Sequence, residues 1–586
     1  MPPYSPETNA VHSSQAALPV LGLNTAKCPH PLLLAVIIVL LTLLVYLPAI
    51  RAGYVWDDDL HLLESVALKD HGLYRTWFTN ESFEYYPVTW TSYWLEHQLW
   101  GQDPMGYHVV NVLIHAVSAL LIWRILIHLG IPGAWLAALI FALHPVNVES
   151  VAWIAQRKNT LSMLFFLSAV WSYLRYEDDD NRRYYCLSVL LFFLAMLSKS
   201  AAVTLPAVLL FCAWWRRGSI GRRDVVATSV FFAVALVMSV IEIYSQSMMV
   251  ATGEVVRADG LWARLAGAGW VVWFYLYKTV VPFGLTFVYP RWLIDPAQWF
   301  SYAPDVMLLA LLVFLWRIGG SFGRSALVAL VYFLITVGPA VGFVDFYYLK
   351  YSFVGDHYQY FSLIGVIALF IALGAHVSGR TGHVGIALAR ALGIALVTVC
   401  GLLTWQQSSQ YKNEITLWHD TIEKNPDAWL AHGNLGMELM NRRDLDLAVL
   451  HLRRAYHLRP RSPMVRSNLG AALTQQGKHT EAMGHLRAAL ERRPDMPVVH
   501  NNLGIVLIHL GKLDDAVTHL QEAIITAPDF DDAHNNLGMA LMRQGKYEEA
   551  IAQFNDALRI NPQHRAAREN LNFAGKMLVG SMNGKP

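Results

Sequence analysis

The sequence predicts an all-α protein in two parts: a bundle of about eleven transmembrane helices, then a carboxyl-terminal superhelix of repeated helix pairs. Composition is the first reason, because 55% of the 586 residues are hydrophobic and only 15% are charged, with a mean hydropathy of +0.35. Such a balance is typical of integral membrane proteins. The second reason is a series of apolar runs between residues 31 and 405, and the third is a strict sequence period that follows them.

Charge and cysteine usage exclude several classes of protein. The formal net charge is only +2, so no global basic field indicates a nucleic-acid partner. The four cysteines are far apart and form neither a disulfide framework nor the spacing of a metal site. The sequence also has no glycine-rich phosphate loop and no convincing nucleotide fingerprint, which argues against a soluble nucleotide-sugar donor and favours a lipid-linked one.

The membrane part is expected at residues 31–410, after a polar and flexible leader at residues 1–30. The first apolar run is too long for a signal-peptide core and lacks a clear cleavage site, so we interpret it as a retained anchor. It is long enough to cross a bilayer core of ~30 Å. The expected helices are 31–50, 109–129, 133–148, 160–176, 184–197, 201–215, 225–245, 305–317, 325–344, 357–377 and 384–405.

The arginines predict the orientation of the bundle. The basic loop at Arg216–Arg223 marks the cytoplasmic side. Segment 264–281 is a twelfth candidate, rich in Trp and Tyr and bounded by Pro282, but counting it as a crossing moves later arginines to the external side. Eleven crossings with a re-entrant or interfacial 264–281 therefore fit better. This count places the acidic loop at Asp57 and the whole carboxyl-terminal part on the external side.

The carboxyl-terminal part repeats every 34 residues. Alanines and a closing proline keep the same register in each unit, which is the tetratricopeptide pattern of paired helices. We expect a domain at 411–580, with four repeats at 429–562 and a capping helix after them. The triplet Asn-Leu-Gly marks the four units and begins at Asn434, Asn468, Asn502 and Asn536.

An acidic triplet, Asp57–Asp59, follows the first helix by a few residues. Lipid, water and a membrane-anchored substrate meet at that depth, and a carboxylate there can act as general base for a hydroxyl nucleophile. The alternative is a helix cap or an ordinary surface acid, since Asp is a favoured N-cap residue. The triplet could also bind Mg²⁺ or Mn²⁺, although we do not expect a metal.

Other loops on the same side carry cations and aromatic residues. Glu84 and Tyr86 lie in a Trp- and Tyr-rich stretch, and acids beside aromatic platforms are typical of sugar sites, although an interfacial amphipathic helix has the same composition. Arg157 and Lys199 are cations at the membrane edge, where a lipid phosphate is a natural partner. Either cation could instead reach toward lipid headgroups. Asp356 could orient a base, bind a sugar hydroxyl or cap the helix that follows.

Six short motifs complete the pattern. They are Tyr54–Asp58, Tyr86–Trp90, Gly106–His108 with Asn111 and His115, His144–Val146 with Glu149, Leu197–Lys199, and Asp356–Tyr358. Their order, joined to the repeat array, resembles the transmembrane-and-tetratricopeptide-repeat proteins, whose membrane half belongs to the GT-C glycosyltransferase superfamily. The resemblance covers nearly the whole chain. It implies transfer of a sugar, typically mannose, from a polyprenyl or dolichyl phosphate to Ser or Thr of a protein.

The resemblance also implies roles for individual residues. Asp57 matches the catalytic base, and Asp58 matches a second acid, often Glu in the family, that supports the acceptor or orients the base. Arg157 and Lys199 match positions that hold the lipid phosphate in an inverting displacement without a metal. His357 stands where many relatives have Arg. The candidates for sugar or acceptor binding are Glu84, Tyr86, His144, Glu149, Tyr289, Asp356 and His357.

The repeats predict a protein or peptide acceptor, because such arrays mostly bind peptides. Asn434, Asn468, Asn502 and Asn536 repeat at one position of each first helix, so their amides could bond to an extended peptide backbone, or equally could bond helix to helix. Two alternatives stay open: a non-catalytic membrane-anchored scaffold, and a transferase that acts on a lipid-linked glycan. The expected location is a bacterial inner membrane with periplasmic repeats, or the endoplasmic reticulum with lumenal repeats.

Overall fold

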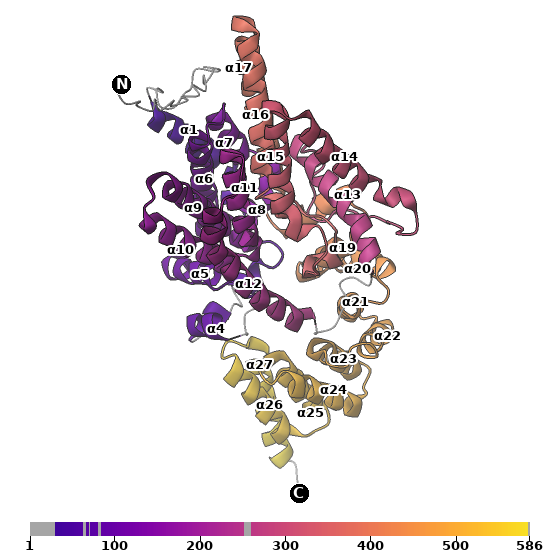
Figure 1. The fold of residues 1–586 in the computed structure, drawn as a ribbon. Helices are drawn as coiled ribbons and strands as arrows, with labels where there is room; N and C mark the ends of the chain where they lie inside the picture. Colours follow the sequence, from indigo (N-terminus) through magenta and orange to yellow (C-terminus); the bar gives the residue numbers. More distant parts are fainter. Residues whose placement is uncertain (1–29, 63–65, 69–70, 80–83, 251–258, 584–586) are drawn as a thin grey trace, which may run out of the picture.

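The computed structural model describes residues 30–62, 66–68, 71–79, 84–250 and 259–583, and every regular element in these ranges is a helix. The expected leader, except residue 30, lies outside the described residues. The helical bundle comes first in the chain, and the repeat array curves below it in Figure 1. The fold is therefore all-α and in two parts, as the sequence predicts.

The bundle contains seventeen α-helices within the described ranges, together with short 3-10 turns. They are α1 (Pro31–Val45), α2 (Leu47–Ile50), α3 (Asp58–Leu62), α4 (Gly72–Phe78), α5 (Pro87–Trp100), α6 (Pro104–His128), α7 (Ala134–Ala142), α8 (Val148–Ala152), α9 (Arg157–Asp179), α10 (Arg182–Ser198), α11 (Leu205–Arg217), α12 (Arg222–Val250), α13 (Leu261–Val280), α14 (Ala303–Ile318), α15 (Gly320–Val337), α16 (Leu363–Arg380) and α17 (Gly382–Gln410). In the described part of the chain, six helices are long and apolar enough to cross a membrane, or seven if the bent pair α7–α8 is one span. The chain is a multi-pass membrane protein, and the count of about eleven crossings stays a prediction.

Two expected helices have different limits in the structure. The helix expected at 133–148 bends by 46° between α7 and α8. Pro145 explains this break, because proline has no N–H to donate and drives the preceding residue, His144, into an extended conformation. The helix expected at 357–377 begins only at Leu363, because Asp356–Gln359 forms a 3-10 turn instead. Both irregular turns contribute side chains to the site described below.

Helix α13 corresponds to the doubtful segment 264–281. Near its start, Arg264 forms an ion pair of 2.9 Å with Asp345, which lies beyond the carboxyl end of α15. Near its end, the carbonyl of Thr279 lies 3.1 Å from His144 Nε2, just beyond the carboxyl end of α7. Both ends of α13 thus contact segments just beyond the carboxyl ends of α15 and α7, and its re-entrant or interfacial course stays a prediction.

The repeat array consists of four helix pairs, preceded by α18 (Glu414–Lys424) and closed by α27 (Arg565–Asn583). In each pair a glycine of the first helix faces a bulky residue of the second. A Cβ added at Gly436 would lie 2.6 Å from Leu452 Cγ, and one added at Gly538 would lie 2.6 Å from the Phe554 ring. The pairs are α19 (Trp429–Asn441) with α20 (Leu445–Leu458), α21 (Pro463–Gln475) with α22 (His479–Leu490), α23 (Pro497–His509) with α24 (Leu513–Thr526), and α25 (Asp531–Arg543) with α26 (Tyr547–Ile560).

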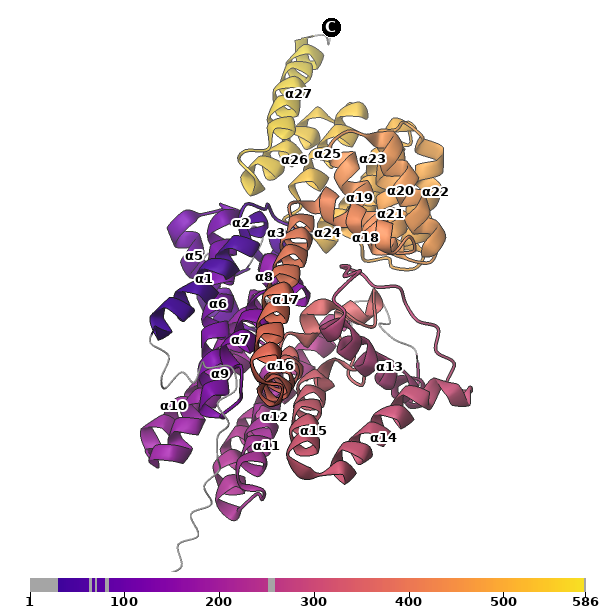
Figure 2. The ribbon, with the colours of Figure 1, turned by 90° about the horizontal axis from the view of Figure 1, so that it is seen from above.

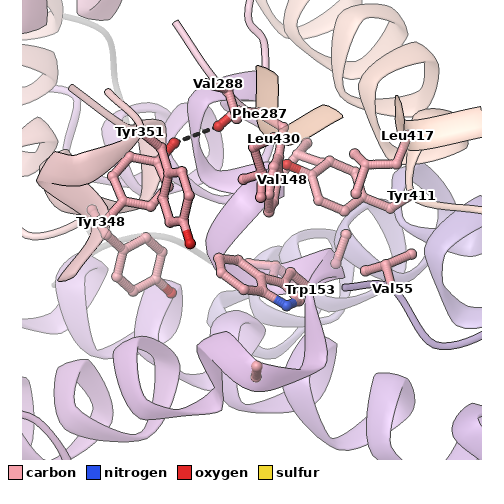
Figure 3. Close-up of a cluster of buried hydrophobic side chains, with 14 of the residues drawn as sticks. Val55, Val148, Trp153, Phe287, Val288, Tyr348, Tyr351, Tyr411, Leu417 and Leu430 are labelled. Atoms are coloured by element: carbon pink, nitrogen blue, oxygen red, sulfur yellow. Dashed lines mark hydrogen bonds between the residues drawn. The ribbon is translucent and has the colours of Figure 1, made fainter. Parts of the chain in front are cut away.

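The two parts share one hydrophobic core. Helix α17 runs from the bundle to the array and leads into α18 (Figure 2). Figure 3 shows side chains of the bundle, such as Trp153 and Phe287, beside Leu417 and Leu430 of the array side. Polar contacts reinforce this interface, because Lys424 Nζ donates to the carbonyl of Leu285 at 2.7 Å. The array side therefore packs directly against the loops of the bundle.

Candidate functional site

Asp57 lies in the turn between α2 and α3, with its side chain 20% exposed. Its Oδ1 accepts a hydrogen bond of 3.1 Å from the indole N–H of Trp153. Burial raises the pKa of Asp57, while the charges of His61 and Lys158 oppose this rise. A carboxylate with a raised pKa is a stronger base than an ordinary surface acid. Asp57 is thus a partly accessible carboxylate, held in place by an indole.

The residue before Asp57 has a strained backbone. Trp56 has φ = +52°, a left-handed conformation that bulky residues rarely adopt. Aromatic rings hold it there: Trp153 stacks on Trp56 with centroids 5.2 Å apart, and Phe287 meets it edge-on, also at 5.2 Å. Strained residues of this kind persist only where surrounding contacts over-determine them, and they cluster at functional sites. Trp153 therefore fixes both Trp56 and the Asp57 carboxylate.

Asp58 is fully buried and accepts two backbone hydrogen bonds. Its Oδ2 accepts from Val55 N at 3.0 Å, and its Oδ1 accepts from Ala155 N at 2.7 Å. Burial, followed by the charge of Asp57, raises the pKa of Asp58. Asp58 thus ties the Asp57 turn to the segment before α9 and presents no free oxygen to a substrate. Asp59, by contrast, is exposed.

Arg157 is fully buried and bound to protein groups. Its guanidinium pairs with the Glu96 carboxylate, donates to the side chain of Asn111, and donates to the carbonyl of Tyr107 at 2.8 Å. The Tyr93 ring lies 5.4 Å from it. A guanidinium with its donors already engaged has little left for a lipid phosphate. The geometry therefore does not support the expected role of Arg157 in binding the donor phosphate, and gives it a structural role at the start of α9.

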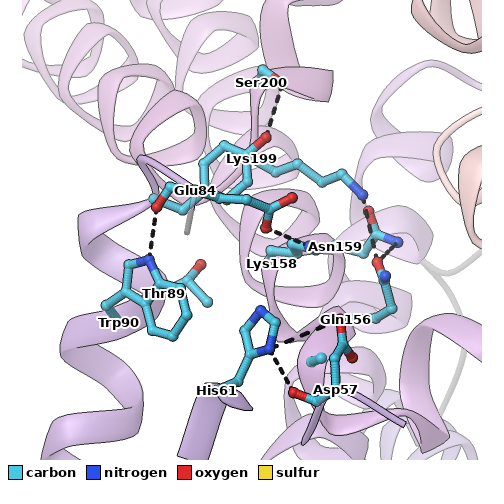
Figure 4. Close-up of polar contacts among 12 residues, drawn as sticks. Asp57, His61, Glu84, Thr89, Trp90, Gln156, Lys158, Asn159, Lys199 and Ser200 are labelled. Atoms are coloured by element: carbon cyan, nitrogen blue, oxygen red, sulfur yellow. Dashed lines mark hydrogen bonds and ion pairs between the residues drawn. The ribbon is translucent and has the colours of Figure 1, made fainter. Parts of the chain in front are cut away.

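The next residue, Lys158, points into the site instead. Figure 4 shows Lys158 with Glu84, at 2.5 Å, and Lys199 with Gln156 on the same side of Asp57. Lys199 Nζ lies 3.5 Å from Gln156 Oε1 and 5.7 Å from the Tyr358 ring centroid. Burial, followed by the positive charge of Lys158, lowers the pKa of Lys199 to about 7.

Lys158 and Lys199 therefore form a pair of neighbouring cations, with Glu84 as the carboxylate bound to Lys158, and such a pair is suited to a phosphate. The sequence reasoning missed Lys158. The sequence did contain a signal for Lys158, because it is a cation adjacent to Arg157. Adjacent side chains at the start of a helix point in different directions, so only one of the two can face the site. Burial raises the pKa of Glu84, but the ion pair with Lys158 outweighs it and the net pKa is lowered.

Glu149, Asp356, His357 and Tyr289 form a buried wall behind the cations. Glu149 Oε2 accepts from the His357 backbone N–H at 3.0 Å, and its Oε1 lies 2.9 Å from His357 Nδ1. Tyr289 donates its hydroxyl to Asp356 at 2.9 Å. Gly355, and not Asp356, is the N-cap residue of the 3-10 turn that Asp356 starts. Burial raises the pKa of Asp356 and lowers that of His357. This wall has polar groups, but most of them are already paired.

Tyr86 and His144 are engaged elsewhere. Tyr86 donates to Glu242 Oε1 at 2.8 Å and lies 3.2 Å from the Ser200 hydroxyl. Both ring nitrogens of His144 have partners, because Nε2 meets the Thr279 carbonyl and Nδ1 accepts from Val146 N at 3.4 Å. Their positions give Tyr86 and His144 structural contacts rather than an open face. Among the described residues, no group of three or more His, Cys, Asp or Glu side chains is placed to hold a metal ion.

The asparagines of the array do not behave alike. Asn536 Nδ2 donates to Asn501 Oδ1 at 2.8 Å, and Asn570, one further period along, donates to Asn535 Oδ1 at 2.9 Å. Asn570 is a fifth member of the series that the sequence reasoning missed, although the 34-residue spacing reaches it. Asn434 Nδ2 is buried without a hydrogen-bond partner among the described residues. The late asparagines therefore join neighbouring repeats, whereas Asn434 keeps an unused donor.

Comparison with known proteins gives the same two parts. Residues 87–243 match the family described as dolichyl-phosphate-mannose-protein mannosyltransferase, and residues 434–497 and 501–565 match the tetratricopeptide repeat. The chain is 30% identical over 142 residues to human "Protein O-mannosyl-transferase TMTC3", and 31% identical over 149 residues to mouse "Protein O-mannosyl-transferase TMTC2". The chain is therefore similar to TMTC protein O-mannosyl-transferases over part of its length. These matches cover 22% and 23% of this chain, and 16% and 18% of the length of the two relatives.

A solved repeat protein is also similar to part of this chain. The structure described as "YrrB: a TPR protein with an unusual peptide-binding site" aligns with 26% of this chain and 80% of its own, at a TM-score of 0.23 and 20% identity. The family matches and the geometry thus assign the two parts independently: a mannosyltransferase-like region that includes Lys158 and Lys199, and a repeat array.

Proposed function

We propose that this chain is a membrane protein O-mannosyltransferase, which moves a mannosyl unit from a polyprenyl or dolichyl phosphate to Ser or Thr of a protein acceptor. One observation carries the proposal: a partly accessible carboxylate, Asp57, lies beside the cation pair Lys158 and Lys199. A base and a phosphate-binding pair are the two parts that such a transfer needs. The mannosyltransferase match over residues 87–243 supports the reaction class.

In the proposed mechanism, Asp57 removes the proton of the acceptor hydroxyl as that oxygen attacks the anomeric carbon. The Trp153 indole N–H holds the carboxylate at Oδ1, and Oδ2, which lies 3.9 Å from His61 Nδ1, is the oxygen proposed to take the proton. Burial makes the carboxylate more basic. The attack is a single displacement and inverts the anomeric configuration. Asp58 acts on Asp57 only through the backbone that it fixes.

The leaving phosphate goes to Lys158 and Lys199. In this structure Glu84 holds Lys158 at 2.5 Å, and a phosphate would replace that carboxylate. A bound anion favours the charged form of Lys199 and so restores a pKa that burial has lowered. Neutralisation of the developing charge by two fixed cations supplies the stabilisation of the transition state. No step requires a metal.

The lipid chain of the donor has a place in the bundle. An apolar cavity of about 300 Å³ lies among α6, α9, α11, α15 and α16, and includes Phe166, Val208, Tyr332 and Ile364 among its lining residues. Ile364 is in the first turn of α16, on the side of the bundle that carries Asp57. The cavity extends from there to Leu129 and Trp215, near the carboxyl ends of α6 and α11, and its length along the helices suits an isoprenoid chain.

The acceptor is proposed to be an extended protein segment held by the array. Asn434, Asn468 and Asn502 are the members of the series without a partner repeat among the described contacts, and their amides suit a peptide backbone. The site and the array would face the periplasm of a bacterium or the lumen of the endoplasmic reticulum. The positive-inside distribution of the arginines supports this orientation.

The test is transfer from a panel of radiolabelled polyprenyl-phosphate sugars to protein, in purified membranes that contain the full chain. Asp57→Asn is expected to lower the rate by roughly 10²–10⁴-fold, whereas Asp59→Asn, a matched change at an exposed neighbour, should stay near wild type. Equal transfer by wild type and Asp57→Asn would remove the role of Asp57. A folded wild-type protein that uses no donor of the panel would overturn the proposed activity.

A further inference from the structure

Helix α18 occupies the register of the second helix in a repeat that has no first helix. Pro426 follows it 34 residues before Pro460, which closes the first complete repeat. Trp418 lies 34 residues before Leu452, the residue that packs against Gly436. The position of the missing glycine falls on Leu402 in α17, which is 66% exposed. Trp418 therefore lacks the glycine of a first helix against which the equivalent residues of the complete repeats pack.

Loops of the bundle take the place of that partner. Trp418 is fully buried. Its ring meets Phe287 edge-on at 5.5 Å and Trp56 at 6.3 Å, with the planes nearly perpendicular in both cases. Trp56 is the residue with φ = +52° that directly precedes Asp57. A side chain of the array side thus completes the ring contacts that hold the strained turn.

A backbone contact from the same region holds the other end of this turn. The N–H of Gly53 donates to the carbonyl of Lys412 at 3.0 Å, just before α18. Segment 53–56 is therefore fixed by residue 412 at its start and by residue 418 at its end. The strain at Trp56 needs such contacts, because a left-handed Trp is stable only where its surroundings impose it.

We propose that Trp418 is a positioning residue for Asp57, so that the transferase site is assembled from both parts of the chain. The array side then has a second role besides holding an acceptor: helix α18, which precedes the first repeat, sets the orientation of the base. This inference rests on the proposed function for its effect on rate. Its structural content, the ordering of residues 53–58 by Trp418, stands independently of any activity.

The test compares Trp418→Ala with Phe554→Ala in the full chain. Phe554 is an equally buried aromatic residue at the same register of the last repeat, where it packs against Gly538. We expect Trp418→Ala to lower kcat at least tenfold with little change in the donor KM, and to increase amide hydrogen exchange across residues 53–58. Phe554→Ala should change neither quantity, and Trp418→Phe should restore most of both. A shift in the acidic limb of the pH profile of kcat should accompany the loss, because Asp57 must be deprotonated to act as the base and its surroundings change.

Two results would overturn the inference: unchanged exchange at residues 53–58 in Trp418→Ala, or the same increase in Phe554→Ala. If the wild type transfers no sugar, the exchange measurement still decides between these outcomes, and only the proposed function fails. If Trp418→Ala does not yield folded protein, Trp418→Leu is measured against the same criteria.

Discussion

The repeat array and the bundle fill their interiors in different ways. In the array, a small and a large residue meet at a fixed interval, as Gly436 meets Leu452 and Gly538 meets Phe554. In the bundle, each buried polar contact occurs once and joins distant segments, as Arg157 joins Glu96 and Asp58 joins the Ala155 N–H. A lost contact in the array has an equivalent in every other repeat. A lost contact in the bundle has no equivalent elsewhere in the bundle. The candidate site lies among these unique contacts.

The largest effect is expected where a unique pair of the bundle is broken. Arg157→Met leaves the Glu96 carboxylate unpaired in a largely buried position, which should cost about 3–5 kcal/mol of stability. The midpoint of thermal unfolding in detergent measures this loss. The double variant Arg157→Met with Glu96→Leu should recover most of it, since it removes both charges. Normal stability with loss of donor binding in Arg157→Met would instead make Arg157 a phosphate ligand.

A smaller effect is expected where a repeated contact of the array is disturbed. An added Cβ at Gly504 would lie 2.5 Å from Leu520 Cγ, so Gly504→Ala should cost about 1–3 kcal/mol through overpacking. Gly484→Ala is the matched control, because this helical glycine has open space where the Cβ would be. The control should be neutral or slightly stabilising. Hydrogen exchange of α23 and α24 measures both variants, and equal behaviour of the two would contradict the packing argument.

The same contrast explains how much could be predicted from the sequence. Periodicity predicts the helix pairs of the array, and it also contains signals that were not used: Pro426 and Asn570 both continue the 34-residue spacing. Apolar runs predict the helices of the bundle but not the bend at Pro145, which depends on a local property of proline.

The candidate site could be predicted less completely from the sequence than the helices could. The distribution of arginines over eleven predicted crossings placed Asp57 and Lys199 on one side of the bundle, which agrees with their proximity in the structure. It could not tell Arg157 from Lys158, because the choice depends on Glu96 and Glu84, which lie far away in the sequence. Both cations are paired in the structure, and the additional partners of Arg157, Asn111 and Tyr107, distinguish it from Lys158, which the proposal assigns to the phosphate.

The pH dependence of donor binding tests the cation pair. Lys199 has a pKa lowered to about 7, so it is charged below this pH and neutral above it. The donor KM should therefore rise above pH 7, by at most about tenfold per pH unit. Lys158→Met removes the positive charge that contributes to the lowering, so the rise should begin at a higher pH, although binding is weaker throughout. Lys478→Met, at an exposed lysine of the array, should leave the pH profile of the donor KM unchanged. An unshifted profile in Lys158→Met would show that the charge of Lys158 does not act on Lys199.

The smallest effect is expected at the seam between the two parts, where Glu414 accepts from the Trp418 indole N–H at 3.4 Å. Burial raises the pKa of Glu414 to about 7, hydrogen bonds from Trp418 and the Trp56 backbone oppose the rise, and the charges of Glu438 and Asp59 add to it. A raised carboxyl pKa means that the docked state is favoured when Glu414 is protonated, and that this advantage is lost as the pH rises from about 4.5 to 7. Hydrogen exchange at residues 53–58 should therefore be slower at pH 6 than at pH 8, after correction for the intrinsic rate. Glu414→Gln, which stays neutral, should remove this difference, and a difference that persists in the variant would assign it to another group.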